Sequence, residues 1–242
     1  MRRATFLIVV AALGLAGCDR VTSMAESLGF KKPPPPPAAA PPPANPVRER
    51  PESITWDEGF GAFWYNGAPL SAARSWSFDR DAQGFSGTAD LSTGLDGTQI
   101  VNRLPDSLLR SPGGLAVDGS RFSLVLVRLT RLSDAPPWDG LLAWTTAGHP
   151  ESAAYHTKPF LGDAPQVNET VILAYDMAHP LKGGDDWTKS LIDQIRIDTD
   201  DGAGSRFRLR EIAIVENPAP DVLKAAPRAA PAAPAAKAAG LR

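Results

Sequence analysis

Short apolar segments, separated by clusters of Gly, Pro, Asp and Ser, fill the chain between residues 74 and 215. No long stretch repeats its apolar residues at helical spacing, whereas several segments alternate apolar and polar residues as half-buried strands do. Nine such strands over this length favour an all-β fold, a two-sheet jelly-roll β-sandwich. The predicted strands are Arg74–Asp79, Thr98–Arg103, Gly114–Val117, Arg121–Leu132, Gly140–Thr146, Ala153–Phe160, Thr170–Asp176, Ile192–Asp198 and Ser205–Val215.

Two of these segments have patterns that predict more than a strand. Arg121–Leu132 is apolar on both faces over Leu124–Val127, which predicts a central strand covered on both sides. In Ser205–Val215 the alternation slips at Glu211. The slip predicts either a bulge or a Glu211 side chain that points inward.

An aromatic-rich segment precedes the first of these strands. Two interpretations remain open for it: a strap that packs across one sheet, or an exposed apolar patch for a partner protein. Its aromatic residues are Trp56, Phe60, Phe63, Trp64 and Tyr65.

The first eighteen residues follow a different pattern. Two arginines precede the apolar segment Phe6–Ala16, which is too short to span a bilayer core of about 30 Å. The four residues that end at Cys18 are Leu-Ala-Gly-Cys, and they resemble the lipobox of bacterial lipoproteins. The resemblance implies that residues 1–17 are a signal peptide and that Cys18 carries a lipid that anchors the chain to a membrane. Asp19 resembles an inner-membrane retention signal, which slightly favours the periplasmic face of the inner membrane of the cell envelope over the outer membrane.

Composition divides the mature chain. Residues 18–32 form the lipid-anchored juxtamembrane segment, either a short amphipathic helix or a spacer, and residues 33–51 form a linker that holds ten of the 24 prolines. A polyproline II linker of this length reaches roughly 60 Å. Residues 217–242 are Ala- and Pro-rich, and we expect a disordered tail that is solvated or contacts an anionic cell-wall polymer. The sandwich is assigned to residues 52–216.

Charge and cysteine content exclude several classes of protein. A net charge of −2 gives no reason to expect nucleic-acid binding, and a single Cys excludes a disulfide framework. Residues 52–216 carry 14 basic and 23 acidic residues, so the charge of this part is 14 − 23 = −9.

Three segments of the predicted sandwich resemble galactose-binding-like jelly rolls, a group that includes many carbohydrate-binding modules. Trp76–Phe85 is similar to the first strand, Gly140–Thr146 to a middle strand, and Ile192–Ile214 to the closing hairpin. The resemblance implies a polysaccharide or peptidoglycan ligand. It also implies a structural calcium near the first and last strands, for which the matching positions are Asp79 and Glu211.

The sequence contains no pattern that indicates catalysis. The three His do not form an HExxH motif, GxSxG is absent, and the only Cys is the predicted lipid attachment site. We therefore predict no catalytic residues and no enzyme activity.

Sugar binding is better supported, because sugars are bound by aromatic faces together with polar groups. Trp138 and Trp187 lie in predicted loops, where they either bind ligand or pack at the rim of the sandwich. Trp144 either faces ligand or, like Trp76, belongs to the core. The candidate ligand-binding residues are Trp138, Trp144, Tyr155, His156, Lys158 and Trp187.

Three functions follow from these predictions. The first is a glycan-binding envelope lipoprotein, the second is a protein–protein adaptor in an envelope assembly, and the third is a polysaccharide-acting enzyme. A sheet face that bears Trp144, Tyr155, His156 and Lys158 would favour the first. An apolar patch of Phe60, Phe63 and Trp64 would favour the second, and two converging carboxylates in a cleft would favour the third.

Overall fold

The computed structural model describes residues 54–94, 96–133, 137–162 and 164–225. The predicted signal peptide, Cys18, the juxtamembrane segment and the proline-rich linker lie outside these residues. Among the described residues no helix is long and apolar enough to cross a membrane.

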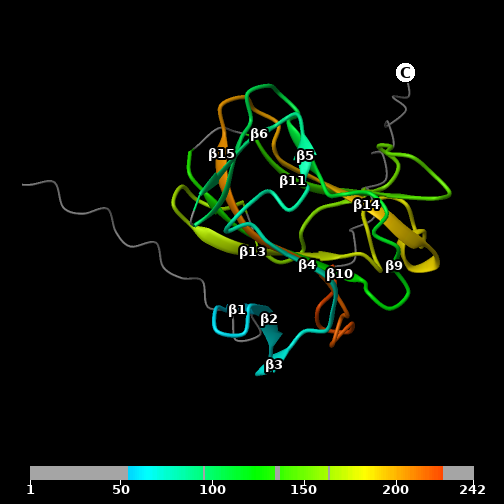
Figure 1. Ribbon diagram of the computed structural model, residues 1–242. Coiled ribbons are helices and arrows are strands. Elements are labelled where there is room, and N and C mark those ends of the chain that lie inside the picture. The colour runs from blue at the N-terminus through cyan, green and yellow to red at the C-terminus, as the bar shows by residue number, and fades with distance from the viewer. Residues whose placement is uncertain (1–53, 95, 134–136, 163, 226–242) are drawn as a thin grey trace, which may run out of the picture. The chain divides into compact units, whose positions relative to one another are not determined.

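The described residues form two six-stranded antiparallel sheets and a small three-stranded one, which confirms the predicted all-β sandwich of jelly-roll type (Figure 1). Sheet 1 has the order β13-β10-β15-β7-β6, with β4 also paired to β15. Its strands are β4 (Ala72–Ser77), β6 (Asp90–Gly94), β7 (Gly97–Val101), β10 (Leu124–Arg131), β13 (Thr170–Asp176) and β15 (Arg206–Val215).

Sheet 2 has the order β12-β11-β14-β8-β5, with β9 also paired to β14. Its strands are β5 (Ser86–Gly87), β8 (Leu108–Arg110), β9 (Val117–Asp118), β11 (Trp138–Thr146), β12 (His156–Thr157) and β14 (Leu191–Asp200). One 3₁₀ turn, η1 (Trp187–Lys189), precedes β14.

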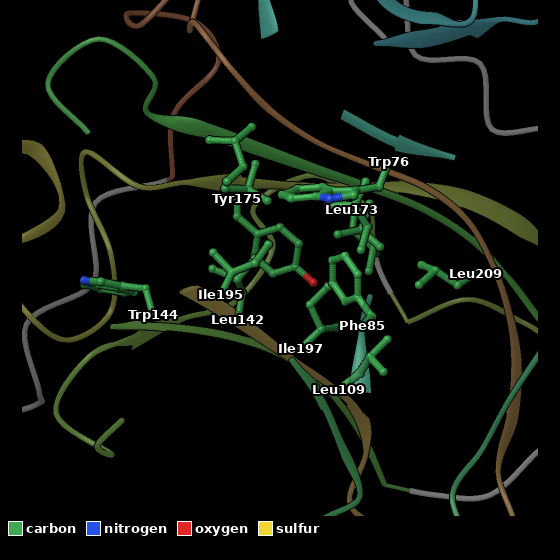
Figure 2. Close-up of a cluster of buried hydrophobic side chains, with 14 of the residues drawn as sticks. Trp76, Phe85, Leu109, Leu142, Trp144, Leu173, Tyr175, Ile195, Ile197 and Leu209 are labelled. Carbon is green, nitrogen blue, oxygen red and sulfur yellow. The ribbon is translucent and has the colours of Figure 1, made fainter. Parts of the chain in front are cut away.

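The main core lies between the two sheets. Alternate residues of β10 and β15 in sheet 1 face alternate residues of β11 and β14 in sheet 2, as the period of two in a strand requires. Each fully buried aliphatic or aromatic side chain contributes about 1.5–3 kcal/mol to folding. Figure 2 shows the centre of this core, with Trp76, Phe85, Leu109, Leu142, Trp144, Leu173, Tyr175, Ile195, Ile197 and Leu209.

A second cluster covers the opposite face of sheet 1, and it explains why β10 is apolar on both faces. Leu124 and Leu126 point away from the main core and are fully buried. The segment 54–70, which we call the strap, lies over them with strands β1 (Thr55–Asp57), β2 (Ala62–Tyr65) and β3 (Ala68–Pro69). The predictions of a central strand and of a strap are both confirmed.

The end of the described chain also packs on this face. The structure continues nine residues beyond the predicted domain boundary at Glu216, because Leu223 supplies an apolar side chain that is 3% exposed in the second cluster. The Asn217 side chain donates to the backbone oxygen of Leu223 at 2.7 Å, and the Ala225 backbone donates to Asp176 at 3.0 Å. The expectation of a disordered tail therefore does not apply to residues 217–225.

The irregularity at Glu211 is a bulge. Arg128 pairs with Glu211 while Leu129 pairs with Leu209, so Arg210 is the extra residue in β15. The bulge keeps Leu209 and Ile212 in the main core and leaves Glu211 on the outer face of sheet 1. The alternative, an inward-pointing Glu211, is wrong.

Sheet membership differs from the sequence prediction at the C-terminal end. The resemblance implied that Ile192–Ile214 forms a closing hairpin, but β14 lies in sheet 2 and β15 in sheet 1. The Gly-rich turn between them therefore connects the two sheets, and each strand finds its partners far away in the sequence. The strands β5, β6 and β8 were not predicted, because they are short and lack clear alternation.

Candidate functional site

The outer face of sheet 2 carries a row of directly paired residues that crosses the sheet and is polar except at the buried Ala143. Ala143 of β11 is paired with His156 on one side and with Arg196 of β14 on the other, and Arg196 is paired in turn with Arg110 of β8, which is paired with Ser86. Residues directly opposite each other in antiparallel strands project from the same face. Four inter-strand steps of about 4.8 Å make this row roughly 19 Å long.

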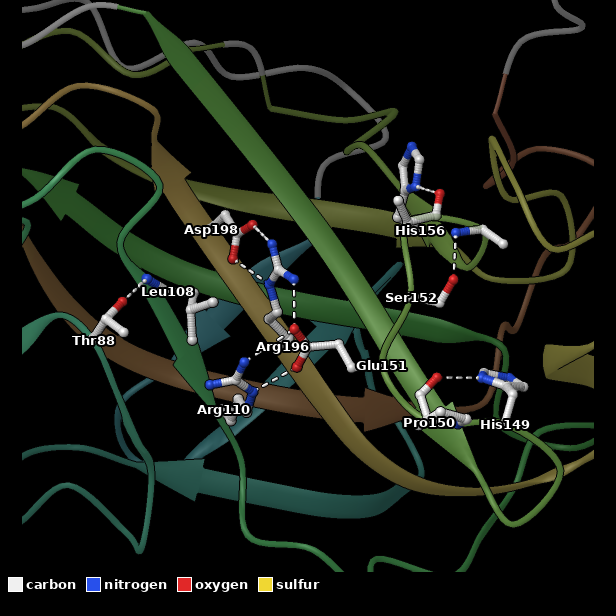
Figure 3. Close-up of polar contacts among 12 residues, drawn as sticks. Thr88, Leu108, Arg110, His149, Pro150, Glu151, Ser152, His156, Arg196 and Asp198 are labelled. Atoms are coloured by element: carbon white, nitrogen blue, oxygen red, sulfur yellow. Dashed lines mark hydrogen bonds and ion pairs between the residues drawn. The ribbon is translucent and has the colours of Figure 1, made fainter.

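Four charged groups form a continuous network in this row (Figure 3). Arg110 donates to Glu151 through Nε at 2.5 Å and through Nη2 at 3.0 Å. Arg196 donates to Glu151 through Nη1 at 2.7 Å. It also donates two hydrogen bonds to Asp198, one from Nε at 2.8 Å and one from Nη2. Such bidentate contacts fix the guanidinium planes, so the row presents preorganised donors and acceptors.

The network is electrically balanced and partly open to solvent. The side chains of Arg110, Glu151 and Arg196 are 33%, 26% and 24% exposed, which leaves their edges available for a ligand. Hydrogen bonds from Arg110 lower the pKa of the Glu151 carboxyl. Burial raises the pKa of Asp198, and Arg196 offsets part of that rise. Both carboxylates accept hydrogen bonds from guanidinium groups.

Of the residues predicted to bind sugar, the structure brings Trp144, Tyr155 and Trp187 into edge-on contact, at centroid distances of 6.0 and 5.7 Å, but at the main core and not on a ligand face. His156 lies on the outer face of sheet 2 in the polar row, and Lys158 forms an ion pair with Asp139 at 2.7 Å. Tyr155 stacks on His149, with ring centroids 3.5 Å apart. Trp144 instead points into the main core and is 1% exposed, so its placement on a ligand face is wrong.

The two loop tryptophans also have other roles. Trp187 is fully buried, and its indole N–H donates to the backbone oxygen of Phe122 at 2.9 Å. It therefore packs in the core and cannot stack on a ligand. Trp138 begins β11, is half-buried and lies 5.8 Å from the Phe207 ring, which corresponds to the predicted rim packing.

The apolar patch expected of a protein-binding surface is not assembled. Phe63 is 2% exposed and belongs to the cluster under the strap. Phe60 is 74% exposed, but its ring contacts Trp64, which is itself half-buried. Among the large apolar side chains of the strap, Phe60 is therefore the exposed one.

The predicted calcium ligands do not fit a cation. Arg128 donates to the Glu211 carboxylate at 3.0 Å, so a positive charge already faces this carboxylate. Asp79 is exposed and accepts a hydrogen bond from Ser77. Within the described part of the chain, no three His, Cys, Asp or Glu side chains gather as metal ligands do.

The sequence analysis missed the four residues of the charged network. Arg196 and Asp198 alternate with Ile195 and Ile197, so their place on the outer face of a strand was available from the pattern. Arg110 lies in a strand of three residues and Glu151 in a loop, and neither position carries a local signal.

Comparisons with known proteins give the following results. No family model matches the chain, and no curated protein matches it. Similar solved structures include carbohydrate-binding modules. A xylan-binding module, CBM86, from Roseburia intestinalis is 12% identical, with a TM-score of 0.37, and the match covers 60% of this chain and 95% of that one. The CBM22-1 xylan-binding domain of Paenibacillus barcinonensis Xyn10C is 10% identical, with a TM-score of 0.39, and the match covers 62% of this chain and 100% of that one.

A family 29 carbohydrate-binding module from Piromyces equi is 9% identical, with a TM-score of 0.39, and the match covers 58% of this chain and 89% of that one. At these identities and TM-scores the similarity carries no argument about ligand. The fold of this chain follows from its own strand order.

Proposed function

We propose that this chain is a lipid-anchored glycan-binding protein of the bacterial cell envelope, and that its ligand binds across the outer face of sheet 2. The observation that carries the proposal is the row of paired residues from His156 to Ser86, in which Arg110 and Arg196 are held in place by ion pairs. A sugar polymer presents many hydroxyl groups along its length. An elongated row of planar, preorganised donors and acceptors suits such a ligand better than it suits a compact one.

The arrangement of the two sheet faces supports this choice. The outer face of sheet 1 is apolar around Leu124 and Leu126, where the strap and Leu223 cover it, and it is polar at Arg128 and Glu211. The outer face of sheet 2 is partly exposed at the ion-paired Arg110 and Arg196, so a ligand can reach these side chains. Both ends of the described chain, at Ile54 and Ala225, pack on the sheet 1 side (Figure 1).

Binding without chemical turnover is also part of the proposal. Glycoside hydrolysis needs a protonated carboxyl group that faces a second carboxylate across the scissile bond. Glu151 accepts from Arg110 and Arg196, and the pKa of Glu151 is lowered, which opposes a role as general acid. Both carboxylate oxygens of Asp198 accept hydrogen bonds from Arg196, which also opposes a role as general acid.

Retention of the purified full-length chain on a series of immobilised envelope and plant polysaccharides tests the glycan function. Arg196→Lys keeps the charge but loses the planar fork, so we expect at least a tenfold weaker retention. The matched control is Arg121→Lys, which alters an exposed ion pair with Glu216 at the end of sheet 1 and should leave retention unchanged. Absence of retention on every polysaccharide, or equal losses in both variants, contradicts the glycan function.

The anchor has its own test. Cells that express the chain are labelled with a fatty-acid probe, and the proposal expects label on the wild type and none on Cys18→Ser. A variant that still acquires the label would contradict lipidation at this residue, and fractionation of the labelled protein distinguishes the inner from the outer membrane.

A further inference from the structure

Two arginines of sheet 2 converge on a single carboxylate that the sheet itself does not supply. Arg110 and Arg196 are directly paired on neighbouring strands, and together they donate three hydrogen bonds, of 2.5, 3.0 and 2.7 Å, to the Glu151 carboxylate. Glu151 belongs to the loop between β11 and β12. A carboxylate from outside the sheet thus accepts hydrogen bonds from both guanidinium groups (Figure 3).

The two arginines differ in what would remain if Glu151 left. Arg196 keeps two hydrogen bonds to Asp198, which lies on the same strand. The ion-pair partner of Arg110 in this network is Glu151. Without Glu151, the guanidinium group of Arg110 would keep its positive charge but lose the carboxylate that accepts its hydrogen bonds. An incoming carboxylate could then reproduce the three hydrogen bonds that Glu151 now accepts.

Contacts away from the two arginines hold the loop in place. His149 contacts Asp186 through Nε2 at 2.9 Å, and its ring stacks on Tyr155. These contacts hold the base of the loop while the Glu151 side chain reaches across β14 to β8. The Glu151 side chain is 26% exposed and belongs to neither buried cluster, so it can leave the two arginines without removing a core contact.

We propose that the Arg110–Arg196 pair is a binding site for the carboxylate of an acidic sugar, a uronic acid, and that Glu151 is an intramolecular competitor that fills this site in the free protein. The inference rests on the proposed glycan function and narrows its ligand class. A site that is occupied by its own side chain binds an external ligand more weakly, in proportion to the time it spends open. Removal of Glu151 therefore strengthens binding of a uronate.

The test measures binding of the purified full-length chain to polygalacturonate, to neutral xylan and to polyglutamate at 0.15 M salt. This ionic strength has a Debye length of about 8 Å, so it screens most of the long-range repulsion between the acidic domain and a polyanion. We expect Glu151→Ala to bind polygalacturonate at least tenfold more tightly than the wild type does, a change of about 1.4 kcal/mol. The isosteric Glu151→Gln should move affinity in the same direction, and Arg110→Gln in the Glu151→Ala background should abolish the gain.

Glu216→Ala provides the matched control, because it removes the carboxylate from another Arg–Glu pair, with Arg121, outside the polar row. It should leave all three affinities unchanged. Unaltered or weaker binding of polygalacturonate by folded Glu151→Ala and Glu151→Gln overturns the inference, as does an equal gain for polyglutamate, which would indicate an unspecific anion site. If the wild type binds xylan and the Glu151 variants gain nothing for polygalacturonate, the inference fails while the glycan function stands. If the wild type binds no polysaccharide at all, the glycan function itself fails.

Discussion

Replacement of Trp187 by alanine separates a structural tryptophan from a ligand-binding one. The indole ring is fully buried, packs edge-on against Trp144 at a centroid distance of 5.7 Å and donates to Phe122 at 2.9 Å. Loss of a buried Trp costs about 3–5 kcal/mol, and the orphaned carbonyl of Phe122 adds to the penalty unless water reaches it. We therefore expect Trp187→Ala to lower the free energy of unfolding by about 4 kcal/mol, a large part of the 5–15 kcal/mol typical of a domain.

Urea unfolding followed by far-UV circular dichroism measures this change. For a slope of about 2 kcal/mol per molar urea, a loss of 4 kcal/mol shifts the midpoint down by roughly 2 M. Trp187→Phe keeps an aromatic ring but loses the hydrogen bond, so its shift should be clearly smaller. An unchanged midpoint in Trp187→Ala, together with a selective loss of glycan retention, would refute the reasoning, because it would place the ring against ligand.

Three further predictions concern stability. Arg110 holds the pKa of the Glu151 carboxyl below its ordinary value of 4.5, so the ion pair stabilises the fold above that pH. This contribution disappears as the pH falls through the lowered pKa of the folded state. The melting temperatures of wild type and Glu151→Gln should therefore differ at pH 7 and converge once the pH is below that lowered pKa, and a constant difference would contradict this. Gly183 and Gly184 both have positive φ, but a Cβ on Gly183 would lie 2.8 Å from the Trp144 ring, whereas one on Gly184 meets nothing within 4 Å. Gly184→Ala should lower the free energy of unfolding by about 1–2 kcal/mol, and Gly183→Ala should lower it clearly more. Equal losses would show that the close contact with Trp144 is relieved without penalty. Leu223 is buried and Val222 is exposed. Leu223→Ala should therefore lower the free energy of unfolding by about 2–3 kcal/mol, and Val222→Ala by less than about 0.5 kcal/mol. Indistinguishable urea midpoints of the two variants would mean that the C-terminal segment does not cover sheet 1.

The sequence by itself determined the strand content and the sidedness of individual strands. The apolar residues on both faces of β10 predicted a covered central strand, and the slip at Glu211 predicted a bulge as one of two alternatives. The structure contains both features. These features follow from the period of two along one strand, which is a property of neighbouring residues. The same alternation placed Arg196 and Asp198 on one face, although it gave no reason to single them out.

Only the tertiary structure decided what covers each face and which side chains meet. Trp187 stands among Gly and Asp in the sequence, yet the fold places it beneath Trp144 in the core. Arg110 and Glu151 are 41 residues apart, and they meet because β8 pairs with β14 while the β11–β12 loop folds over that pairing. Burial and ion pairing are set by segments distant in sequence, whereas alternation along a strand is local, and this difference separates the features that were predicted from those that were not.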